Sequence, residues 1–229
     1  MHDDDGGERH SRVEEPRVVT DPDELAQLEA RNALRQFDAV CLMIEEWLQP
    51  ERRFKLRASM VLQLHRAALE GLSAYAGNYR PGSVDIEGSS HQPHGAHLVP
   101  ELVEEMCDYI NDHWNDRTAL HLSAYVMWRL NWIHPFSDGN GRTSRAVSYL
   151  VLCMKLGYKL PGTRTIPAQI ADNKKPYYLT LEEADAAYKS GQVDVSALED
   201  FLGKLLACQL MDVYESATSG KNGGENRFH

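Results

Sequence analysis

The stretch HPFSDGNGRTSR, residues 134–145, lies between two helical patterns and decides how they connect. Pro135 ends the first pattern, because a residue that precedes proline is disfavoured in the α-helical region. The residues that follow, AVSYLVLCMKLG, place apolar side chains at helical spacing and stop at Gly157. Arg142 and Arg145 therefore fall in the predicted first turn of a helix, where each cation costs up to about 1 kcal/mol against the helix dipole. We expect an anionic ligand there.

The residues just before the arginines supply groups of several chemical kinds. His134 is fixed where the first helix ends and is a candidate base, and Asp138 is a carboxylate that could hold Mg²⁺. Gly139 and Gly141, on either side of Asn140, allow successive backbone N–H groups to converge on an anion at a helix N-terminus. Each feature alone has an ordinary structural explanation, such as a turn or a solvated surface. Their combination indicates a phosphate-binding site with a base beside it.

The composition indicates an acidic protein in a reducing compartment. The 229 residues carry a net charge of -10, which argues against a nucleic-acid-binding surface because phosphate backbones select a basic face. Cys41, Cys107, Cys153 and Cys208 are scattered through apolar helical patterns, so we expect buried free thiols. No apolar run approaches the roughly 18 residues that span a bilayer, and the polar N-terminus lacks the apolar core of a signal peptide. We therefore expect a cytoplasmic protein that binds neither nucleic acid nor a membrane.

The chain is predicted to form one all-α domain, residues 20–216, between disordered segments at 1–19 and 217–229. One segment breaks the helical pattern. Residues 79–95 carry turn signals at both ends around a short apolar alternation, which predicts a short β-hairpin or an extended segment; we call it the flap. The predicted helices span about residues 21–47, 52–75, 100–114, 118–133, 140–156, 175–188 and 195–214.

The stretch at 134–145 resembles the signature HPFx(D/E)GNGRxxR of the Fic family, with which it agrees at every specified position. Two flanking segments resemble the family as well: YRPGSVDI at 79–86 is similar to its flap, and KKPYYLTLEEA at 174–184 to a segment with adjacent tyrosines. The resemblance is strong at the signature and looser elsewhere over roughly residues 24–215. It implies the helical Fic fold.

The resemblance implies a protein adenylyltransferase, a nucleotidyltransferase that moves AMP from ATP to a Ser, Thr or Tyr hydroxyl of an unidentified target protein. On this interpretation a neutral His134 takes the proton of the attacking hydroxyl, and Asp138 holds Mg²⁺ against the phosphates. Phe136 anchors the loop in the core. The predicted nucleotide-binding residues are Gly139, Asn140, Gly141, Arg142, Arg145, Tyr177 and Tyr178.

Several of these roles have a second interpretation. Asn140 could fix the loop or contact phosphate, and Tyr177 or Tyr178 could face adenine or pack between helices.

Gly141 favours AMP transfer over phosphoryl transfer, since Doc-type members that phosphorylate their targets carry a lysine at this position. In the flap, Val84, Asp85 and Ile86 are expected to align an extended target segment by main-chain pairing. The resemblance leaves a homodimer open.

Arg145 is expected to need a counter-charge when ATP is absent, which many Fic proteins provide with an inhibitory glutamate. Glu29 is our candidate, on the first predicted helix. The pattern SVDIEG at 83–88 matches the family's inhibitory motif by chance in our interpretation, and Glu225 in the tail is a further alternative.

Two other functions stay open beside AMP transfer. The same site could remove AMP from modified targets with Glu29 positioning water, or the protein could sense ATP without turnover as a toxin–antitoxin type regulator. The spacing of His91, His94 and His97 resembles that of a metal site, but Pro93 and Gly95 would break a helix that aligned the three side chains. Histidines that belong to the flap are therefore a better interpretation than a zinc site.

Overall fold

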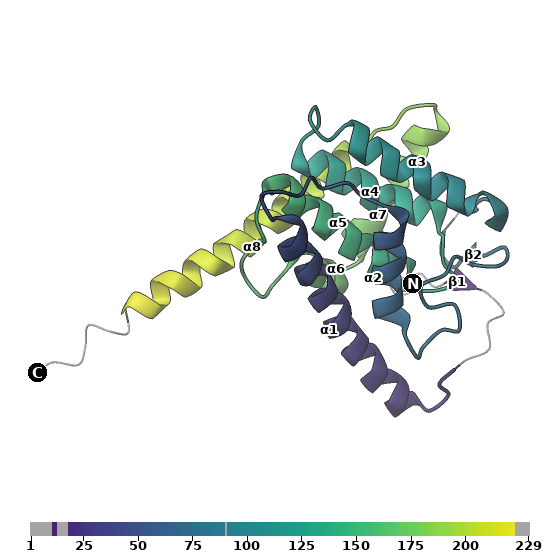
Figure 1. Ribbon diagram of the computed structural model, residues 1–229, viewed down its shortest axis with the longest axis horizontal. Helices are drawn as coiled ribbons and strands as arrows, with labels where there is room; N and C mark the ends of the chain where they lie inside the picture. Colours follow the sequence, from purple (N-terminus) through teal and green to yellow (C-terminus); the bar gives the residue numbers. More distant parts are fainter. Residues whose placement is uncertain (1–10, 13–17, 90, 223–229) are drawn as a thin grey trace, which may run out of the picture.

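The computed structural model describes residues 11–12, 18–89 and 91–222, which form a helical bundle with one very short pair of strands (Figure 1). The fold is all-α, as predicted. In chain order the elements are β1 (Ser11–Arg12), α1 (Pro22–Trp47), α2 (Ala58–Leu69), β2 (Asp85–Ile86), a 3₁₀ turn (Ala96–Leu98), α3 (Val99–Asp112), α4 (Ala119–Ile133), α5 (Asn140–Leu156), α6 (Ile166–Asp172), α7 (Lys175–Lys189) and α8 (Ser196–Asn222).

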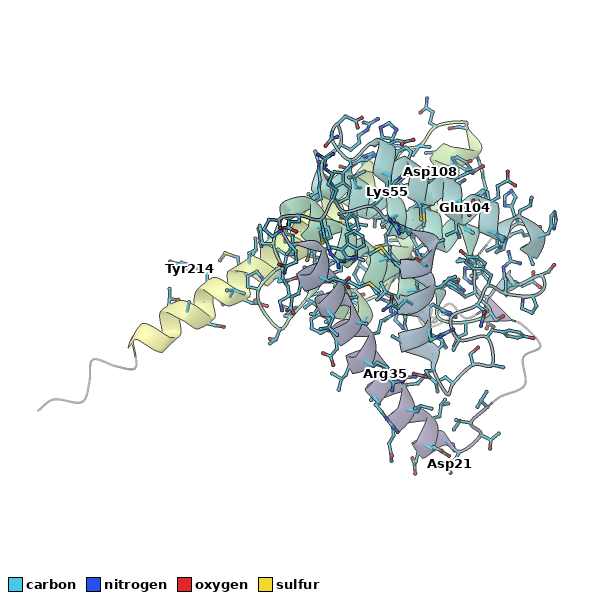
Figure 2. The ribbon with its side chains drawn as sticks, viewed as in Figure 1. Asp21, Arg35, Lys55, Glu104, Asp108 and Tyr214 are labelled. Carbon is cyan, nitrogen blue, oxygen red and sulfur yellow. The ribbon has the colours of Figure 1, made fainter. Side chains whose placement is uncertain are left out.

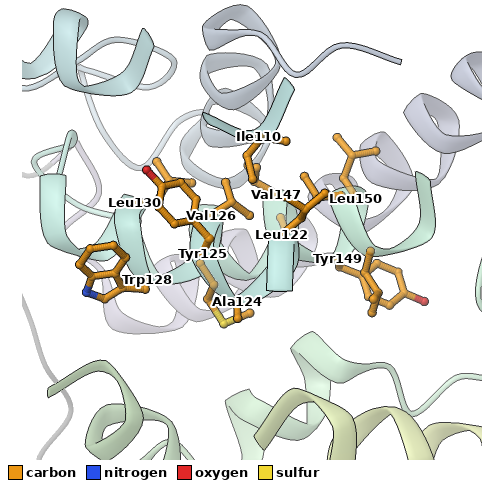
Figure 3. Close-up of a cluster of buried hydrophobic side chains, with 14 of the residues drawn as sticks. Ile110, Leu122, Ala124, Tyr125, Val126, Trp128, Leu130, Val147, Tyr149 and Leu150 are labelled. Carbon is orange, nitrogen blue, oxygen red and sulfur yellow. The ribbon is translucent and has the colours of Figure 1, made fainter. Parts of the chain in front are cut away.

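Helix α4 lies at the centre of the bundle and is buried on almost every side. Its sequence, ALHLSAYVMWRLNWI, is apolar all round, which is typical of a helix that other helices enclose. Val126 and Trp128 of α4 and Val147 and Leu150 of α5 belong to one apolar cluster, and the two helices pack along their lengths (Figure 3). The loop that joins them, residues 134–139, is the first half of the stretch 134–145, and residues 140–145 are the first turns of α5, so the core itself fixes both ends of this loop.

Helix ends follow the capping signals of the sequence. Asp21 caps α1, and its carboxylate accepts the N–H of Glu24 at 2.9 Å (Figure 2).

At the other end of the chain, the last turns of α8 extend away from the bundle, where Tyr214 is 65% exposed (Figures 1 and 2). None of the helices in the described part of the chain is both long enough and apolar enough to cross a membrane.

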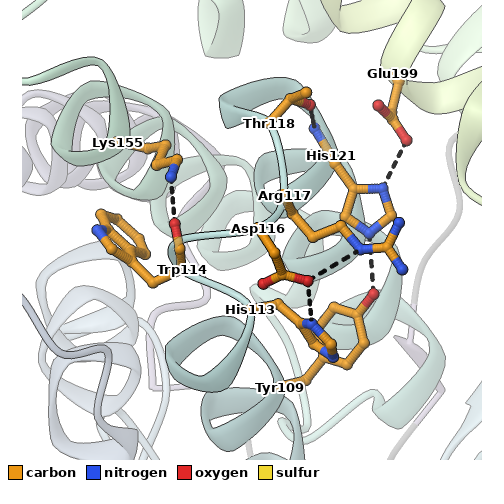
Figure 4. A network of polar contacts seen from close by, with 9 residues as sticks. All are labelled: Tyr109, His113, Trp114, Asp116, Arg117, Thr118, His121, Lys155 and Glu199. Carbon is orange, nitrogen blue, oxygen red and sulfur yellow. Dashed lines mark hydrogen bonds and ion pairs between the residues drawn. The ribbon is translucent and has the colours of Figure 1, made fainter.

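A polar network joins α3, α4 and α8 on one side of the bundle (Figure 4). The imidazole of His121 bridges Tyr109 of α3, at 2.9 Å from the hydroxyl, and Glu199 of α8, at 2.8 Å from the carboxylate. Thr118 caps α4 by accepting the N–H of His121 at 3.0 Å. The network therefore aligns the start of the central helix with its neighbours.

The flap is not the predicted hairpin. Within residues 79–89 and 91–95 only Asp85 and Ile86 form a strand, and they pair antiparallel with Ser11 and Arg12 of β1. The N-terminal segment supplies the partner strand, so the prediction of disorder for residues 1–19 is wrong at 11–12. Helix α8 likewise continues to Asn222, through part of the tail predicted to be disordered; residues 1–10, 13–17 and 223–229 lie outside the described residues.

The structure differs from the predicted helices at two places. Helix α2 begins at Ala58 and not near residue 52, because the side-chain amide of Asn111 bonds the backbone N–H and C=O of Leu56 and holds that segment extended. Helix α6 was not predicted, although Thr165 caps it and Pro167 occupies its first turn. 

The four cysteines are free thiols, as expected, but they are not all buried. Cys107 and Cys153 are buried in the core, Cys41 is half-buried and Cys208 is exposed. Cys208 lies at an exposed position of α8, so its apolar neighbours in the sequence gave a misleading indication of burial.

Candidate active site

A cavity of about 490 Å³ opens between α1, α4, α5, α7 and the flap. It brings together nearly all of the predicted site residues from both sides of the bundle. Val84 and Asp85 of the flap do not line it, since Val84 is buried in the core and Asp85 is exposed. The predicted residues that line it are Glu29, Ile86, His134, Asp138, Gly139, Asn140, Gly141, Arg142, Arg145, Tyr177 and Tyr178.

His134 caps the C-terminus of α4 in a left-handed conformation, with φ of 51°. It is the one non-glycine residue with positive φ in the described part of the chain. Its Nδ1 lies 3.3 Å from the carbonyl oxygen of Asn131, which can only accept, so Nδ1 carries the proton of this bond. The pKa of His134 is lowered to about 4, chiefly by burial, with smaller contributions from the nearby Arg80 and His91; the bond to Asn131 opposes this effect. The imidazole is therefore neutral at pH 7, with the lone pair on Nε2.

Asn140 fixes the loop between the helices. Its Oδ1 accepts the N–H of Phe136 at 2.9 Å and its Nδ2 donates to the C=O of the same residue at 2.8 Å. Phe136 is fully buried, as the sequence predicted, so the loop is anchored by one ring and one amide. Of the two alternatives for Asn140, loop fixation is the one for which the structure shows contacts.

His65 of α2 was not singled out from the sequence, yet it supports the same loop. Its Nδ1 accepts the N–H of Gly77 at 3.0 Å, which leaves Nε2–H to donate to the C=O of Asp138 at 3.0 Å. Its ring stacks on Phe136 at 3.7 Å. Burial lowers the pKa of His65 to about 4, so this arrangement is that of the neutral ring. A single histidine on an apolar helix face carries no sequence signal for such a role.

Gly139 is required by both its conformation and its surroundings. It precedes α5 with φ of +75°, where a side chain is strained. A Cβ atom at this position would lie 2.4 Å from Cδ2 of Leu69. At Gly141 a Cβ atom would lie 3.2 Å from Nη1 of Arg145, so a larger side chain would press on that guanidinium.

Arg142 is held between two carboxylates. Its Nη2 donates to Oδ2 of Asp138 at 2.8 Å, and its Nη1 lies 3.6 Å from Oε1 of Glu29 on α1. Asp138 also accepts the N–H of Gly139 at 2.5 Å. We expected Glu29 to face Arg145, but the structure places it beside Arg142, because α1 crosses the first turn of α5 at that side of the cavity.

The two adjacent tyrosines differ in their surroundings. Tyr177 is 1% exposed, and its hydroxyl accepts an N–H of Asn131 at 2.7 Å. Burial raises the pKa of Tyr177. Tyr178 is half-buried at the cavity wall. Helix packing therefore describes Tyr177, whereas Tyr178 is the more exposed of the two tyrosines at the cavity.

The flap is tied to the end of α4 by a buried arginine that the sequence analysis missed. Arg80 is 2% exposed, and its Nε donates to the C=O of His134 at 2.8 Å. His91 of the flap contacts the carbonyl oxygen of Trp132 at 2.6 Å, and His94 packs on the Trp132 ring. No group of three or more potential metal ligands occurs among the described residues.

Comparison with known proteins agrees with this architecture. Residues 55–152 match the sequence model described as Fic/DOC family, and this range contains α2, the flap, α4, the loop and most of α5. Residues 55–152 of this chain belong to the Fic/DOC family. The family match covers the stretch 134–145 and the base candidate His134 at its start.

The Fic/DOC region is similar to curated proteins named protein adenylyltransferase Fic. The protein from Drosophila persimilis is 31% identical over 109 residues, which cover 47% of this chain and 21% of the relative. The protein from Nematostella vectensis is 34% identical over 105 residues, which cover 43% of this chain and 23% of the relative. The matched region thus spans about a fifth of the length of these relatives.

Solved Fic structures share the fold. A Fic family protein from Desulfovibrio desulfuricans G20 has a TM-score of 0.64 at 24% identity, covering 87% of this chain and 56% of that chain. Fic-1 from C. elegans has a TM-score of 0.63 at 22% identity, covering 82% and 52%. BepC from Bartonella tribocorum, solved with bound AMPPNP, has a TM-score of 0.55 at 16% identity, covering 82% and 88%.

Proposed function

We propose that this Fic/DOC protein is a nucleotidyltransferase that moves AMP from ATP to a hydroxyl group of a target protein. The observation that carries the proposal is a buried, neutral His134 that shares one cavity with Arg142, Arg145 and the N-terminus of α5. The names of the curated relatives support the reaction, and the AMPPNP bound to BepC supports a nucleotide in a cavity of this fold.

His134 acts as the base in the proposed reaction. The target oxygen forms a bond to the α-phosphorus, the bond to pyrophosphate breaks, and Nε2 of His134 takes the hydroxyl proton. A base positioned in this way contributes about 10²–10⁴ in rate. The pKa of about 4 leaves the free imidazole unprotonated, and the negative charge of a bound triphosphate raises the pKa again. 

The phosphates bind at the positive end of α5. Backbone N–H groups at this helix terminus favour an anion, and the guanidinium groups of Arg142 and Arg145 border the same space. Arg142 pairs with Asp138 and Glu29, and a polyphosphate competes with these carboxylates for it. The proposal therefore assigns Glu29 as a brake that weakens ATP binding by occupying Arg142.

Asp138 fits a role as the ligand of Mg²⁺. Its side chain is 57% exposed at the cavity, and a single carboxylate completed by phosphate oxygens and water is how Mg²⁺ is commonly held in nucleotide sites. When bound, Mg²⁺ would supply positive charge to the phosphate oxygens as pyrophosphate departs. Asp138 would have to exchange its bond with Arg142 for the ion, which would release that guanidinium to the phosphates.

The target is expected to dock on the flap in an extended conformation. Ile86 of β2 lines the cavity, so a segment paired with β2 lies at the cavity entrance. β1 of the same chain already pairs with β2, so a target must displace β1 or use the opposite edge of β2.

AMP removal is a second candidate because Glu29 lines the same cavity as His134. A carboxylate in this place could position water for attack on the phosphorus of an AMP-modified target. ATP sensing without turnover is a weaker candidate, because phosphate binding does not require a buried neutral imidazole.

The test is incubation of the protein with Mg²⁺, a cell lysate and ATP labelled on either the α- or the γ-phosphate. We expect α-label on protein, lost in His134→Ala and retained in His97→Ala, since His97 is exposed and lies outside the cavity. Transfer of γ-label alone would identify a kinase, and ATP binding without label transfer would identify a sensor. Loss of label from AMP-modified lysate would identify AMP removal.

A further inference from the structure

We propose that Arg80 is the positioning residue for His134, and that its buried guanidinium fixes the base and the flap as one unit. The inference rests on the proposed function of His134 as the base. Arg80 lies outside the 134–145 stretch and does not line the cavity, so its effect on the reaction passes through His134.

Arg80 donates hydrogen bonds to three carbonyl groups from two segments. Its Nε donates to the C=O of His134 at 2.8 Å, its Nη1 donates to the C=O of Gly82 at 2.7 Å, and its Nη2 donates to the C=O of His94. Its backbone N–H adds a bond to the C=O of Pro135 at 2.9 Å. The planar fork of the guanidinium suits such a junction, because it presents donors in fixed directions.

The burial of this cation is unusual for a residue without an acidic partner. Arg80 is 2% exposed, and in the described part of the chain no carboxylate forms an ion pair with it. Burying a charge is costly unless the charge is hydrogen-bonded. If this position served packing alone, an apolar side chain of similar size would fill it at a lower cost in free energy. The acceptor at His134 lies at the C-terminus of α4, where the helix dipole favours a cation.

The backbone of His134 needs external support. A non-glycine residue in the left-handed region costs about 1–2 kcal/mol, and such residues persist where their surroundings fix them. Arg80 bonds the carbonyl groups of both His134 and Pro135, through Nε and through its backbone N–H. The direction of the imidazole therefore depends on Arg80.

Arg80 also couples the flap to the base. Gly82 and His94 lie on either side of β2, and both carbonyl groups share the guanidinium with His134. His91 adds a contact from the flap to Trp132, two residues before His134. A target segment that pairs with β2 is thereby held in a fixed relation to the base. The positive charge of Arg80 also lowers the pKa of His134, after the larger effect of burial.

The test compares Arg80→Met and Arg80→Lys with Arg129→Met in the full chain. Arg129 is a suitable control because it is also buried, at 6% exposure, and its guanidinium stacks on Trp132 without a bond to the His134 carbonyl. The measurements are kcat and KM for ATP per folded molecule, the pKa of His134 by NMR, and hydrogen exchange in the flap.

We expect Arg80→Met to lower kcat by about 10²-fold with a smaller change in KM, because misplacement of a catalytic group acts on the transition state. The pKa of His134 should rise and exchange in the flap should increase. Arg80→Lys keeps the charge but cannot span three carbonyl groups, so kcat should fall while the pKa of His134 stays low. Arg129→Met should leave the pKa of His134 unchanged.

An unchanged kcat in Arg80→Met, or equal shifts of the His134 pKa in Arg80→Met and Arg129→Met, would overturn the inference. If the unsubstituted protein transfers no AMP, the proposed function fails on its own. In that case the NMR titration and the flap exchange still decide whether Arg80 positions His134 and the flap.

Discussion

Asn140 and Arg142 lie two residues apart, yet they serve different parts of the site. The amide of Asn140 forms hydrogen bonds with the backbone of Phe136 and fixes the loop. The guanidinium of Arg142 faces the cavity between Asp138 and Glu29. The difference follows from the direction of each side chain at the start of α5. A residue type that suits phosphate binding therefore does not by itself establish contact with phosphate.

Glu29→Gln should strengthen ATP binding, because it removes one negative charge that competes for Arg142. The carboxylate is half-exposed, so the expected gain is modest, about 0.2–1 kcal/mol or up to about fivefold in Kd. Isothermal titration calorimetry with a non-hydrolysable ATP analogue measures it. Glu24→Gln is the matched control on the same helix, outside the cavity. Equal affinities of Glu29→Gln and the unsubstituted protein would exclude Glu29 as a brake.

At the scale of elements, the flap obtains its order from contacts with distant segments. Strand β2 is two residues long and pairs with β1, and Arg80 at the start of the flap bonds the C=O of His134 as well as those of Gly82 and His94. Two-residue strands have little intrinsic stability, since isolated two-stranded pairs are marginal in water. The flap is thus the element most sensitive to substitutions elsewhere in the chain.

Arg12→Pro should release β1 from β2, because proline has no N–H to donate and is poorly tolerated in a paired strand. We expect faster amide exchange at Asp85 and Ile86, and more α-label on lysate proteins if targets use the edge that β1 occupies. Arg12→Ala removes the same side chain but retains the N–H and serves as the control. Increased exchange without increased labelling would show that targets use the opposite edge.

At the scale of the whole molecule, two buried histidines make stability depend on pH. Burial lowers the pKa of both His65 and His134 from 6.5 to about 4, so the unfolded chain binds these protons more tightly than the folded one. Their contribution is fully present above pH 6.5 and is lost as the pH falls toward 4. Both residues support the same loop, so acid acts on the site and on the fold together.

The free energy of unfolding should therefore fall between about pH 6.5 and pH 4, by up to about 1.4 kcal/mol per pH unit for each of the two groups. Urea denaturation over this range measures the slope. His65→Gln should remove its own part of the slope, whereas His97→Ala, at an exposed position, should not change it. An unchanged slope in His65→Gln would contradict the burial effect.

Local patterns in the sequence predicted the helical class, most helix positions and the site stretch at 134–145. Those features depend on local periodicity, on proline and glycine, and on the chemistry of adjacent side chains, all of which are readable along the chain. Tertiary structure alone decided that β1 pairs with β2, that Glu29 faces Arg142, and that His65 and Arg80 support the loop. These contacts join residues far apart in sequence, and their partners are mostly backbone carbonyl groups, which every residue carries and no sequence pattern distinguishes.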